Sequence, residues 1–177
     1  MHRLFIALRP PLAIRTGLRA VMHGVAGARW QDDAQLHLTL RYIGDLPARA
    51  AEEVALALTT IRAPAPEVAL AGVGWFAGER AGPALWAGVA PHDALAALHR
   101  KLDRALVALG LPAEGRAYLP HITLARCARS VPVPEAFLAT HAGLSSPPFR
   151  MDALIPYESL RGQGGAHYQP RARVALG

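Results

Sequence analysis

Two short segments of the sequence repeat a histidine and a threonine separated by one apolar residue. They are residues 37–39 (His-Leu-Thr) and residues 121–123 (His-Ile-Thr). Residues two apart in a β-strand point to the same face, so each segment is expected to set an imidazole beside a hydroxyl. The apolar middle residue then points to the opposite face, toward a core. A single copy is typical of a polar pair on a strand surface, whereas two matched copies indicate a shared site.

Two imidazoles in one site are suited to concerted acid–base chemistry. Free imidazole has a pKa near ~6.5, so at neutral pH one ring can accept a proton while a second, kept protonated by a nearby phosphate, donates one. Cleavage of a phosphodiester needs such a base and acid, together with donors to the non-bridging oxygens. Thr39 and Thr123 are suited as those donors, because each hydroxyl offers one O–H. This chemistry requires no metal ion.

Other site chemistries fit the sequence less well. The acidic residues near the repeated segments match no metal-binding pattern, and they are Asp32, Asp33, Asp45 and Glu114. The sole cysteine, Cys127, excludes an intrachain disulfide and follows His121 by six residues without an evident orienting acid. We therefore predict no metal, no cofactor and no cysteine nucleophile.

Length and composition are those of a folded globular protein. The chain has 177 residues, of which 52% are hydrophobic and 18% are charged, and the length fits one domain over residues 1–177. The longest stretch without Asp, Glu, Lys or Arg, residues 136–149, is too short and too polar to span a bilayer. The N-terminal residues do not form a secretory signal pattern. We therefore expect a cytoplasmic protein without a membrane partner.

The charge of the chain favours a polyanionic partner. The formal net charge is +6, and Lys101 is the only lysine among 19 basic residues. The arginines are dispersed along the chain and form no continuous basic run of the kind found in disordered tails. Because the planar guanidinium suits phosphate, the composition points to nucleic acid or a phosphorylated small molecule. A role of these arginines in solubility alone is the competing interpretation.

The repeated segments must be held by surrounding elements, and hydrophobic spacing predicts these for the first half of the chain. A strand is expected over residues 3–8, followed by a helix that stops near Gly24. A second strand over residues 36–43 carries the first histidine. An amphipathic helix over residues 47–62 follows it.

The second half repeats this order. Strands over residues 68–76 and 84–89 are joined by a polar turn at 78–82, a leucine-striped helix follows over 95–109, and a strand over 118–126 carries the second histidine. A short helix over 134–141 and strands over 149–160 and 167–174, joined by a glycine-rich turn at 161–165, complete the chain. Because both halves hold a strand, a helix and a histidine-bearing strand, the pattern predicts an α+β fold of two similar lobes.

The two histidine segments in their context resemble a known family. LHLTLRYIG at residues 36–44 and PHITLAR at 120–126 are similar to the two His-x-Thr-x motifs of the two-histidine phosphoesterase superfamily, and more narrowly of the RNA 2′,3′-cyclic phosphodiesterase (2′-5′ RNA ligase) family. RLFIAL, GVGWF, LWAGV and the stretch from Ser159 to Tyr168 also stand in the family's order. The resemblance implies a bilobal fold with pseudo-twofold symmetry, antiparallel sheets lining a central cleft and helices outside.

The resemblance also implies roles for individual residues. His37 resembles the family's proton donor to the departing 3′ oxygen, and His121 resembles the proton acceptor that activates water. Thr39 and Thr123 are then expected to hold the phosphate. The candidates for substrate binding, through their charge or as walls of the cleft, are Arg126, Arg41, Phe5 and Tyr168. The other six histidines have no paired partner, and we interpret them as surface or incidental residues.

The expected function is that of an RNA 2′,3′-cyclic 3′-phosphodiesterase. Such an enzyme opens the cyclic phosphate of RNA ends or nucleotides to a 2′-phosphate, and reversible 2′-5′ RNA ligation belongs to the same expectation. We expect a monomer without a cofactor. Two alternatives stay open, a phosphodiesterase for another cyclic or ADP-ribose-derived phosphate and a non-catalytic RNA-binding protein that uses its arginines for affinity alone. Replacing either histidine would impair both enzymes and spare the binding protein.

Overall fold

The computed structural model describes residues 1–78, 81–163 and 165–177. Within these residues the helices are α1 (Leu12–Val21), α2 (Ala48–Leu58), α3 (Asp93–Ala108) and α4 (Glu135–Thr140), with a short 3-10 helix, η1 (Asp33–Gln35). The strands are β1 (His2–Leu8), β2 (Ala28–Trp30), β3 (Leu38–Leu46), β4 (Glu67–Phe76), β5 (Ala84–Ala90), β6 (His121–Cys127), β7 (Phe149–Arg150), β8 (Ala153–Gly162), β9 (Gly165–Pro170) and β10 (Val174–Ala175).

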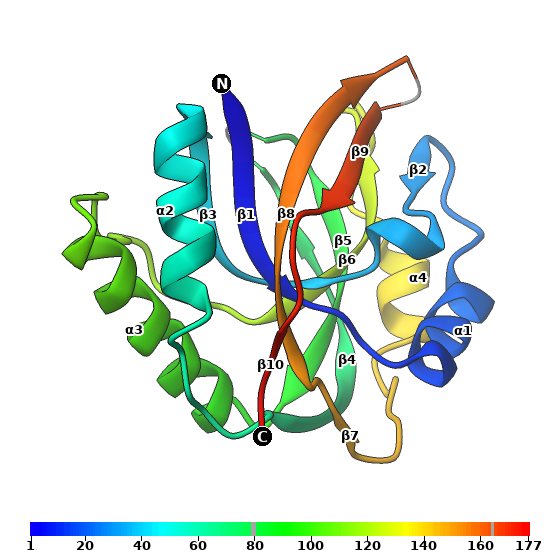
Figure 1. The fold of residues 1–177 in the computed structure, drawn as a ribbon. Helices are drawn as coiled ribbons and strands as arrows, with labels where there is room; N and C mark the ends of the chain where they lie inside the picture. Colours follow the sequence, from blue (N-terminus) through cyan, green and yellow to red (C-terminus); the bar gives the residue numbers. More distant parts are fainter. Residues whose placement is uncertain (79–80, 164) are drawn as a thin grey trace.

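The described strands join into one curled antiparallel sheet (Figure 1). The order along it is β10-β8-β1-β3-β6-β5-β4-β7, with β2 paired to β6 and β9 paired to β8. The two central strands, β3 and β6, are far apart in the sequence and meet through Leu38 and Ile122. The antiparallel strands of the two lobes therefore join into a single sheet.

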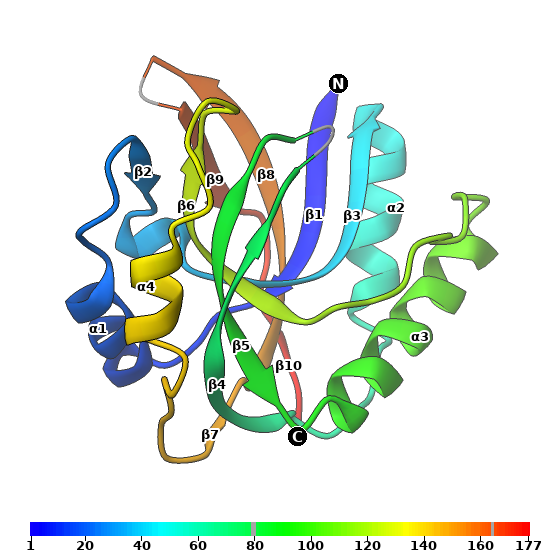
Figure 2. The same ribbon diagram turned by 180° about the vertical axis from the view of Figure 1, so that it is seen from behind.

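The two halves of the chain are related by an approximate twofold symmetry about the β3–β6 pair. Apart from the short elements β2 and η1, the first half runs β1-α1-β3-α2, and the second half runs β5-α3-β6-α4. Figures 1 and 2 show α2 beside α3 at one side of the molecule and α1 beside α4 at the other. A twofold rotation that exchanges α1 with α3 and α2 with α4 turns one of these pairs into the other. The predicted α+β fold with two similar lobes is confirmed.

Apolar residues of the helices and of the sheet build one main core. Leucines spaced by three and four residues make one face of α3, and those that are at most 2% exposed are Leu95, Leu98, Leu102 and Leu106. A smaller cluster on the other face of β1 and β8 consists of Phe5, Ala7, Ala153, Ile155 and Tyr157, with Tyr168 packed against it. Helices thus cover the outer face of the sheet, while part of the inner face is aromatic.

Two predicted strands are divided in the structure. The strand expected over residues 149–160 is β7 and β8, separated by Met151 and Asp152. The two pieces cannot be continuous, because β7 pairs with β4 while β8 pairs with β1, four places further along the sheet. The strand expected over residues 167–174 is likewise β9 and β10, both of which pair with β8.

Smaller differences concern the ends and turns of elements. The helix expected over residues 47–62 ends at Leu58, and the strand expected from residue 118 begins at His121. The predicted turns at 78–82 and 161–165 include Glu79, Arg80 and Gly164, which lie outside the described residues. In the part of the chain that the structure describes, no helix combines the length and the apolar character needed to cross a bilayer.

Candidate active site

The pairing of β3 with β6 brings the two His-x-Thr segments together. Leu38 and Ile122 oppose each other in this antiparallel pair, and both are fully buried in the core. Continuing their register sets His37 in line with Thr123 and sets Thr39 in line with His121. All four polar residues are half-buried, consistent with side chains that stand on the inner face of the sheet. The expected alternation of polar and core residues is therefore present in both strands.

Each histidine is oriented by a backbone carbonyl two residues earlier in the chain. Nδ1 of His37 donates to the carbonyl oxygen of Gln35 at 2.6 Å, and Nδ1 of His121 donates to that of Leu119 at 2.7 Å. A carbonyl oxygen only accepts, so the proton of each neutral ring is assigned to Nδ1 and the lone pair to Nε2. Nε2 of His37 lies 3.1 Å from Oγ1 of Thr39. The two rings thus have matching tautomers, each with Nε2 left to exchange a proton.

Both histidines have depressed pKa values. The pKa of His37 is lowered from its ordinary value to about 4, chiefly by burial and to a smaller extent by the neighbouring Arg126 and His121, against the opposing effect of the Gln35 carbonyl. Burial is also the main cause of the lowered pKa of His121, and Arg126 again adds to it. Both rings are therefore neutral at pH 7 in the free protein.

Aromatic side chains enclose His37 on the inner face of the sheet. The ring of Phe5 lies 4.9 Å from the imidazole between centroids, and the ring of Tyr168 contacts it edge-on at 5.3 Å. Tyr157 completes this wall at 6.0 Å. These rings cover His37, so that Phe5 and Tyr168 lie beside the imidazole of the candidate site.

A second pair of aromatic residues borders His121. Phe76 on β4 meets the imidazole edge-on at 4.9 Å, and Trp86 on β5 lies 6.1 Å from it. Trp86 packs across the backbone of Gly74, where an added Cβ would come within 2.1 Å of the indole ring. Gly74 is therefore needed for this position of the tryptophan. Neither aromatic residue was singled out from the sequence, because an aromatic residue in a strand more often belongs to the core.

A β-bulge brings Arg126 to the same face as the histidines. The register of β6 against β5 shifts after Thr123 and leaves Leu124 as an extra residue. A bulge of this kind reverses the alternation of the side chains that follow. Arg126 therefore turns inward although it lies five residues after His121. The charge of Arg126 lowers the pKa of both histidines. No carboxylate of the described residues forms an ion pair with Arg126.

The equivalent bulge in β3 has the opposite consequence for Arg41. The register of β3 against β1 shifts after Thr39 and leaves Leu40 as the extra residue, so Arg41 pairs with Ile6 and turns with it toward the core side. The position that matches Arg126 is occupied by Tyr42, which faces the inner side with Phe5.

Arg41, a candidate for substrate binding from the sequence, is engaged by groups of the protein itself. Its side chain is 8% exposed, and Nε donates to Asp103 on α3 at 2.8 Å. Nη1 donates to the carbonyl of Tyr42 at 2.6 Å and lies 3.7 Å from the carboxylate of Glu114, while Nη2 donates to the carbonyl of Pro112. Each nitrogen of the guanidinium thereby has a partner within the protein, and the contacts with Asp103, Glu114 and Pro112 hold α3 and the loop after it against β3.

A cavity of about 500 Å³ opens beside Thr39 and His121. Its walls include His99 and Tyr118, whose rings stack in parallel at 4.2 Å. Nδ1 of His99 donates to the carbonyl of Leu40, the extra residue of the bulge, at 2.7 Å.

His99 is therefore neither on the surface nor incidental, in contrast to the interpretation from sequence. The sequence does indicate this buried position, because His99 continues the spacing of the buried leucines on α3.

Other chemical groups near the site are few. Among the residues that the structure describes, no three His, Cys, Asp or Glu side chains gather closely enough to hold a metal ion. Cys127 is buried, and this burial raises the pKa of its thiol. A raised pKa disfavours the thiolate that a nucleophilic cysteine needs.

Comparisons with known proteins agree with this architecture. Residues 10–163 match the model of the 2′-5′ RNA ligase superfamily. An RNA 2′,3′-cyclic phosphodiesterase of Geobacillus stearothermophilus is 38% identical over 100 residues, which are 55% of this chain and 32% of that protein. One of Aeropyrum pernix is 29% identical over 116 residues, which are 64% of this chain and 66% of that protein. The matched part thus spans less than two thirds of either relative.

A solved structure extends the likeness to nearly the whole chain. The crystal structure of E. coli LigT complexed with 3′-AMP superposes with a TM-score of 0.78 at 26% identity, covering 99% of this chain and 98% of LigT. The match of the family model over residues 10–163 includes both histidine segments. The chain belongs to the 2′-5′ RNA ligase superfamily.

Proposed function

We propose that this protein hydrolyses the 2′,3′-cyclic phosphate of RNA ends or nucleotides to a 2′-phosphate. The observation that carries the proposal is the matched pair of imidazoles, each with Nδ1 bound to a carbonyl and a threonine two residues further on. Two curated relatives named RNA 2′,3′-cyclic phosphodiesterase and the complex of LigT with 3′-AMP support the choice of substrate.

In the proposed reaction, the two histidines act from opposite sides of the phosphate. Nε2 of His121 accepts a proton from water as the water oxygen bonds to phosphorus. The bond between phosphorus and O3′ breaks, and Nε2 of His37 donates its proton to O3′, which leaves a 3′-hydroxyl and a 2′-phosphate. With a 5′-hydroxyl in place of water, the same step would form a 2′-5′ linkage.

Three further side chains are proposed to hold the phosphate. The hydroxyls of Thr39 and Thr123 donate to non-bridging oxygens, and Arg126 supplies positive charge for the transition state. Phe5 and Tyr168 border the site beside His37. The bound phosphate also favours the protonated form of His37 that a proton donor needs. A negative charge beside this ring raises the pKa that burial has lowered.

The test is the hydrolysis of a nucleoside 2′,3′-cyclic phosphate in the presence of EDTA. We expect wild type to form the 2′-phosphate, and His37→Ala and His121→Ala each to lower kcat by about 10²-fold or more, as is usual on loss of a general acid or base. Phosphorus NMR identifies the product isomer. His23→Ala is the matched control, because that histidine is exposed and lies at the end of α1.

Three results would contradict the proposal in different ways. Absence of turnover by wild type would favour the RNA-binding protein. Turnover that both histidine variants retain would remove these residues from the reaction. Efficient hydrolysis of an ADP-ribose-derived cyclic phosphate, with RNA-type cyclic phosphates left intact, would select the alternative substrate class while keeping the two-histidine chemistry.

A further inference from the structure

Two arginines lie directly opposite each other next to the candidate site. Arg29 on the short strand β2 is the cross-strand partner of Arg126 on β6. The neighbours of Arg29 along β2, Ala28 and Trp30, pack against the main core. By strand alternation, Arg29 therefore points to the inner face together with Arg126.

This pair of like charges is not neutralised within the described residues. Neither Arg29 nor Arg126 forms an ion pair with any described carboxylate. Like charges directly opposite each other in a sheet are destabilising. Their juxtaposition on the inner face thus favours an anion as the missing partner.

The position of the Arg29 guanidinium depends on a glycine of the next hairpin. A Cβ at Gly165, where β9 begins, would lie 2.3 Å from Nη1 of Arg29. Gly165 has a φ of +117°, a backbone conformation that residues with a side chain rarely adopt. The guanidinium therefore occupies a space that only glycine leaves open, between β2 and β9.

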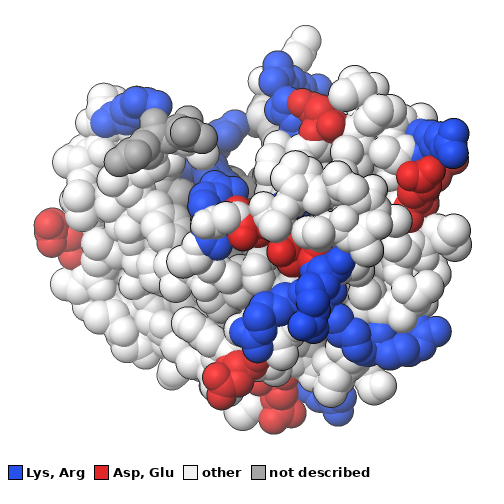
Figure 3. Space-filling view, turned by 90° about the vertical axis from the view of Figure 1, so that its left-hand side faces the viewer, with Lys and Arg blue, Asp and Glu red and all other residues white. Residues whose placement is uncertain are grey.

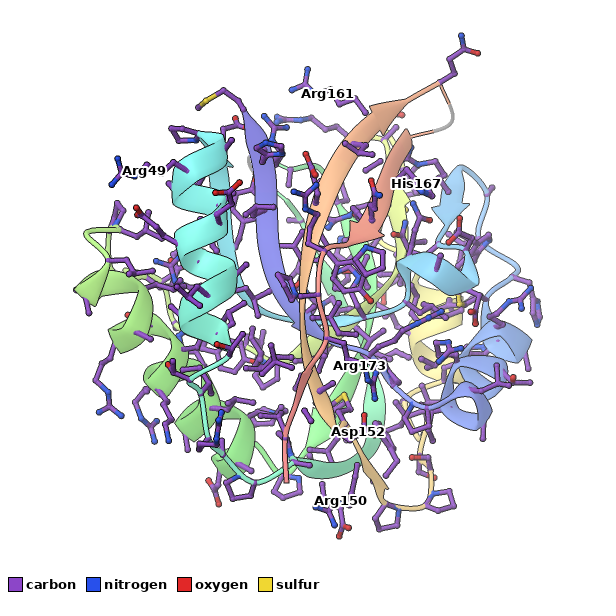
Figure 4. All side chains as sticks on the ribbon, viewed as in Figure 1. Arg49, Arg150, Asp152, Arg161, His167 and Arg173 are labelled. Atoms are coloured by element: carbon purple, nitrogen blue, oxygen red, sulfur yellow. The ribbon has the colours of Figure 1, made fainter. Side chains whose placement is uncertain are left out.

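A cavity of about 360 Å³ adjoins this arginine. His167 also lines this cavity, and Figure 4 places this residue on β9. Asp32 also lines the cavity, but its carboxylate accepts the backbone N–H of Gln35 at 2.9 Å. The charged side chains among the residues that line the cavity are therefore Arg29 and this engaged carboxylate.

Gln35 connects this cavity with the catalytic candidates. Its carbonyl accepts from Nδ1 of His37, and its side-chain amide donates to the carbonyl of Ala166 on β9 at 2.7 Å. Gln35 therefore lies between the candidate site and this cavity. A strand whose terminal phosphate lies between the two histidines would reach Arg126 first and Arg29 next.

We propose that Arg29 binds the phosphodiester that precedes the terminal cyclic phosphate of an RNA strand. This inference rests on the proposed function and adds to it a preference for oligonucleotides over mononucleotides. Guanidinium suits the role because its planar fork can donate two parallel hydrogen bonds to one phosphate. Arg29 is a binding residue in this scheme and takes no part in proton transfer.

The experiment compares a nucleoside 2′,3′-cyclic phosphate with a trinucleotide that ends in the same group. We expect the trinucleotide to have a KM about tenfold lower for wild type, and Arg29→Gln to raise that KM about tenfold, which is the order of effect for one hydrogen-bonded charge. The mononucleotide should keep its KM and kcat in this variant, which also reports an intact fold. Arg29→Lys should retain most of the advantage, because the positive charge remains.

A binding measurement separates this inference from the proposed function. The affinity of a trinucleotide with a terminal 2′-phosphate, measured by fluorescence anisotropy at several salt concentrations, requires no turnover. Loss of one phosphate contact should reduce the slope of log Kd against log salt by about 0.7 in Arg29→Gln. If wild type hydrolyses neither substrate, the proposed function fails. The difference in salt slope between wild type and Arg29→Gln still shows whether Arg29 contacts a phosphate.

Arg100→Gln is the control for charge alone. Arg100 is exposed on α3, and Figure 3 shows that basic side chains gather on the face that carries α2 and α3. We expect this variant to bind the trinucleotide as wild type does. Three results would overturn the proposal: an unchanged slope in Arg29→Gln, an equal loss for the mononucleotide, or a loss in Arg100→Gln that Arg29→Gln does not show.

Discussion

His37 and His121 share an orientation but differ in their surroundings. Three aromatic rings surround His37, whereas Phe76 and Trp86 border His121. Burial and the charge of Arg126 both favour the neutral form of each ring. A proton donor that is neutral in the free protein must gain its proton as the anionic substrate binds. Binding and acid catalysis are therefore coupled in the proposed reaction.

This coupling predicts the pH dependence of hydrolysis. Because both histidine pKa values lie below the ordinary value, kcat/KM of wild type should reach its maximum on the acidic side of about pH 6.5. Arg126→Gln removes a charge that lowers both pKa values, so its maximum should shift to higher pH while KM rises. The measurement is kcat/KM between pH 4 and 8. Arg150→Gln, on the distant strand β7, should leave the profile in place, and an unshifted Arg126→Gln profile would count against the coupling.

The depressed pKa of His37 also makes folding dependent on pH. The pKa is about 4 in the folded protein and about 6.5 in the unfolded chain, so the neutral ring stabilises the fold fully above pH 6.5. This contribution, on the order of 2–3 kcal/mol, is lost as the pH falls from 6.5 to 4. His37→Gln should therefore lose less stability than wild type over this range. Urea unfolding at pH 7 and pH 4.5 measures the difference, and parallel losses in the two proteins would refute it.

The two bulges mark how far strand periodicity could predict the site. Alternation correctly placed the histidines and threonines on one face, since both segments precede the bulges. Alternation alone could not predict which face of the sheet carries Arg41, because the extra residue Leu40 shifts the register of β3. The ion-pair partner of Arg41, Asp103, lies 62 residues away in the chain. Strand β2, which carries Arg29, was missed because three residues are too few to show a period. Local spacing thus predicts elements, whereas bulges and distant ion pairs depend on tertiary contacts.

The ion pairs of Arg41 should stabilise the packing of α3 on β3. Arg41→Met leaves Asp103 and Glu114 without their shared cation, and removal of one partner from a largely buried pair costs about 2–4 kcal/mol. Asp103→Asn should cost less, and the double variant should lose less than the two single losses together. Chemical denaturation of the four proteins measures this coupling. Strictly additive losses would show that the contact contributes no coupling energy.

The sheet joins both halves of the chain, and this continuity argues for a single folding unit over residues 1–177. β3 and β6 pair across the symmetry axis, and one apolar cluster contains buried residues from α1, α2, α3 and α4. The hydrophobic surface of either half is therefore covered in part by the other. We also expect the protein to be a monomer, which sedimentation equilibrium would measure.

Cooperative unfolding tests this unity directly. Leu18→Ala in α1 and Leu102→Ala in α3 each remove a fully buried side chain, one from each half, at a cost of about 2–5 kcal/mol. If the halves fold together, each variant should lower the midpoint of one transition that circular dichroism and tryptophan fluorescence report alike. Independent lobes would instead give two transitions, with only the lobe that carries the substitution affected. A single transition is the expected result, because separating the lobes would break the β3–β6 pair on which the two histidines depend.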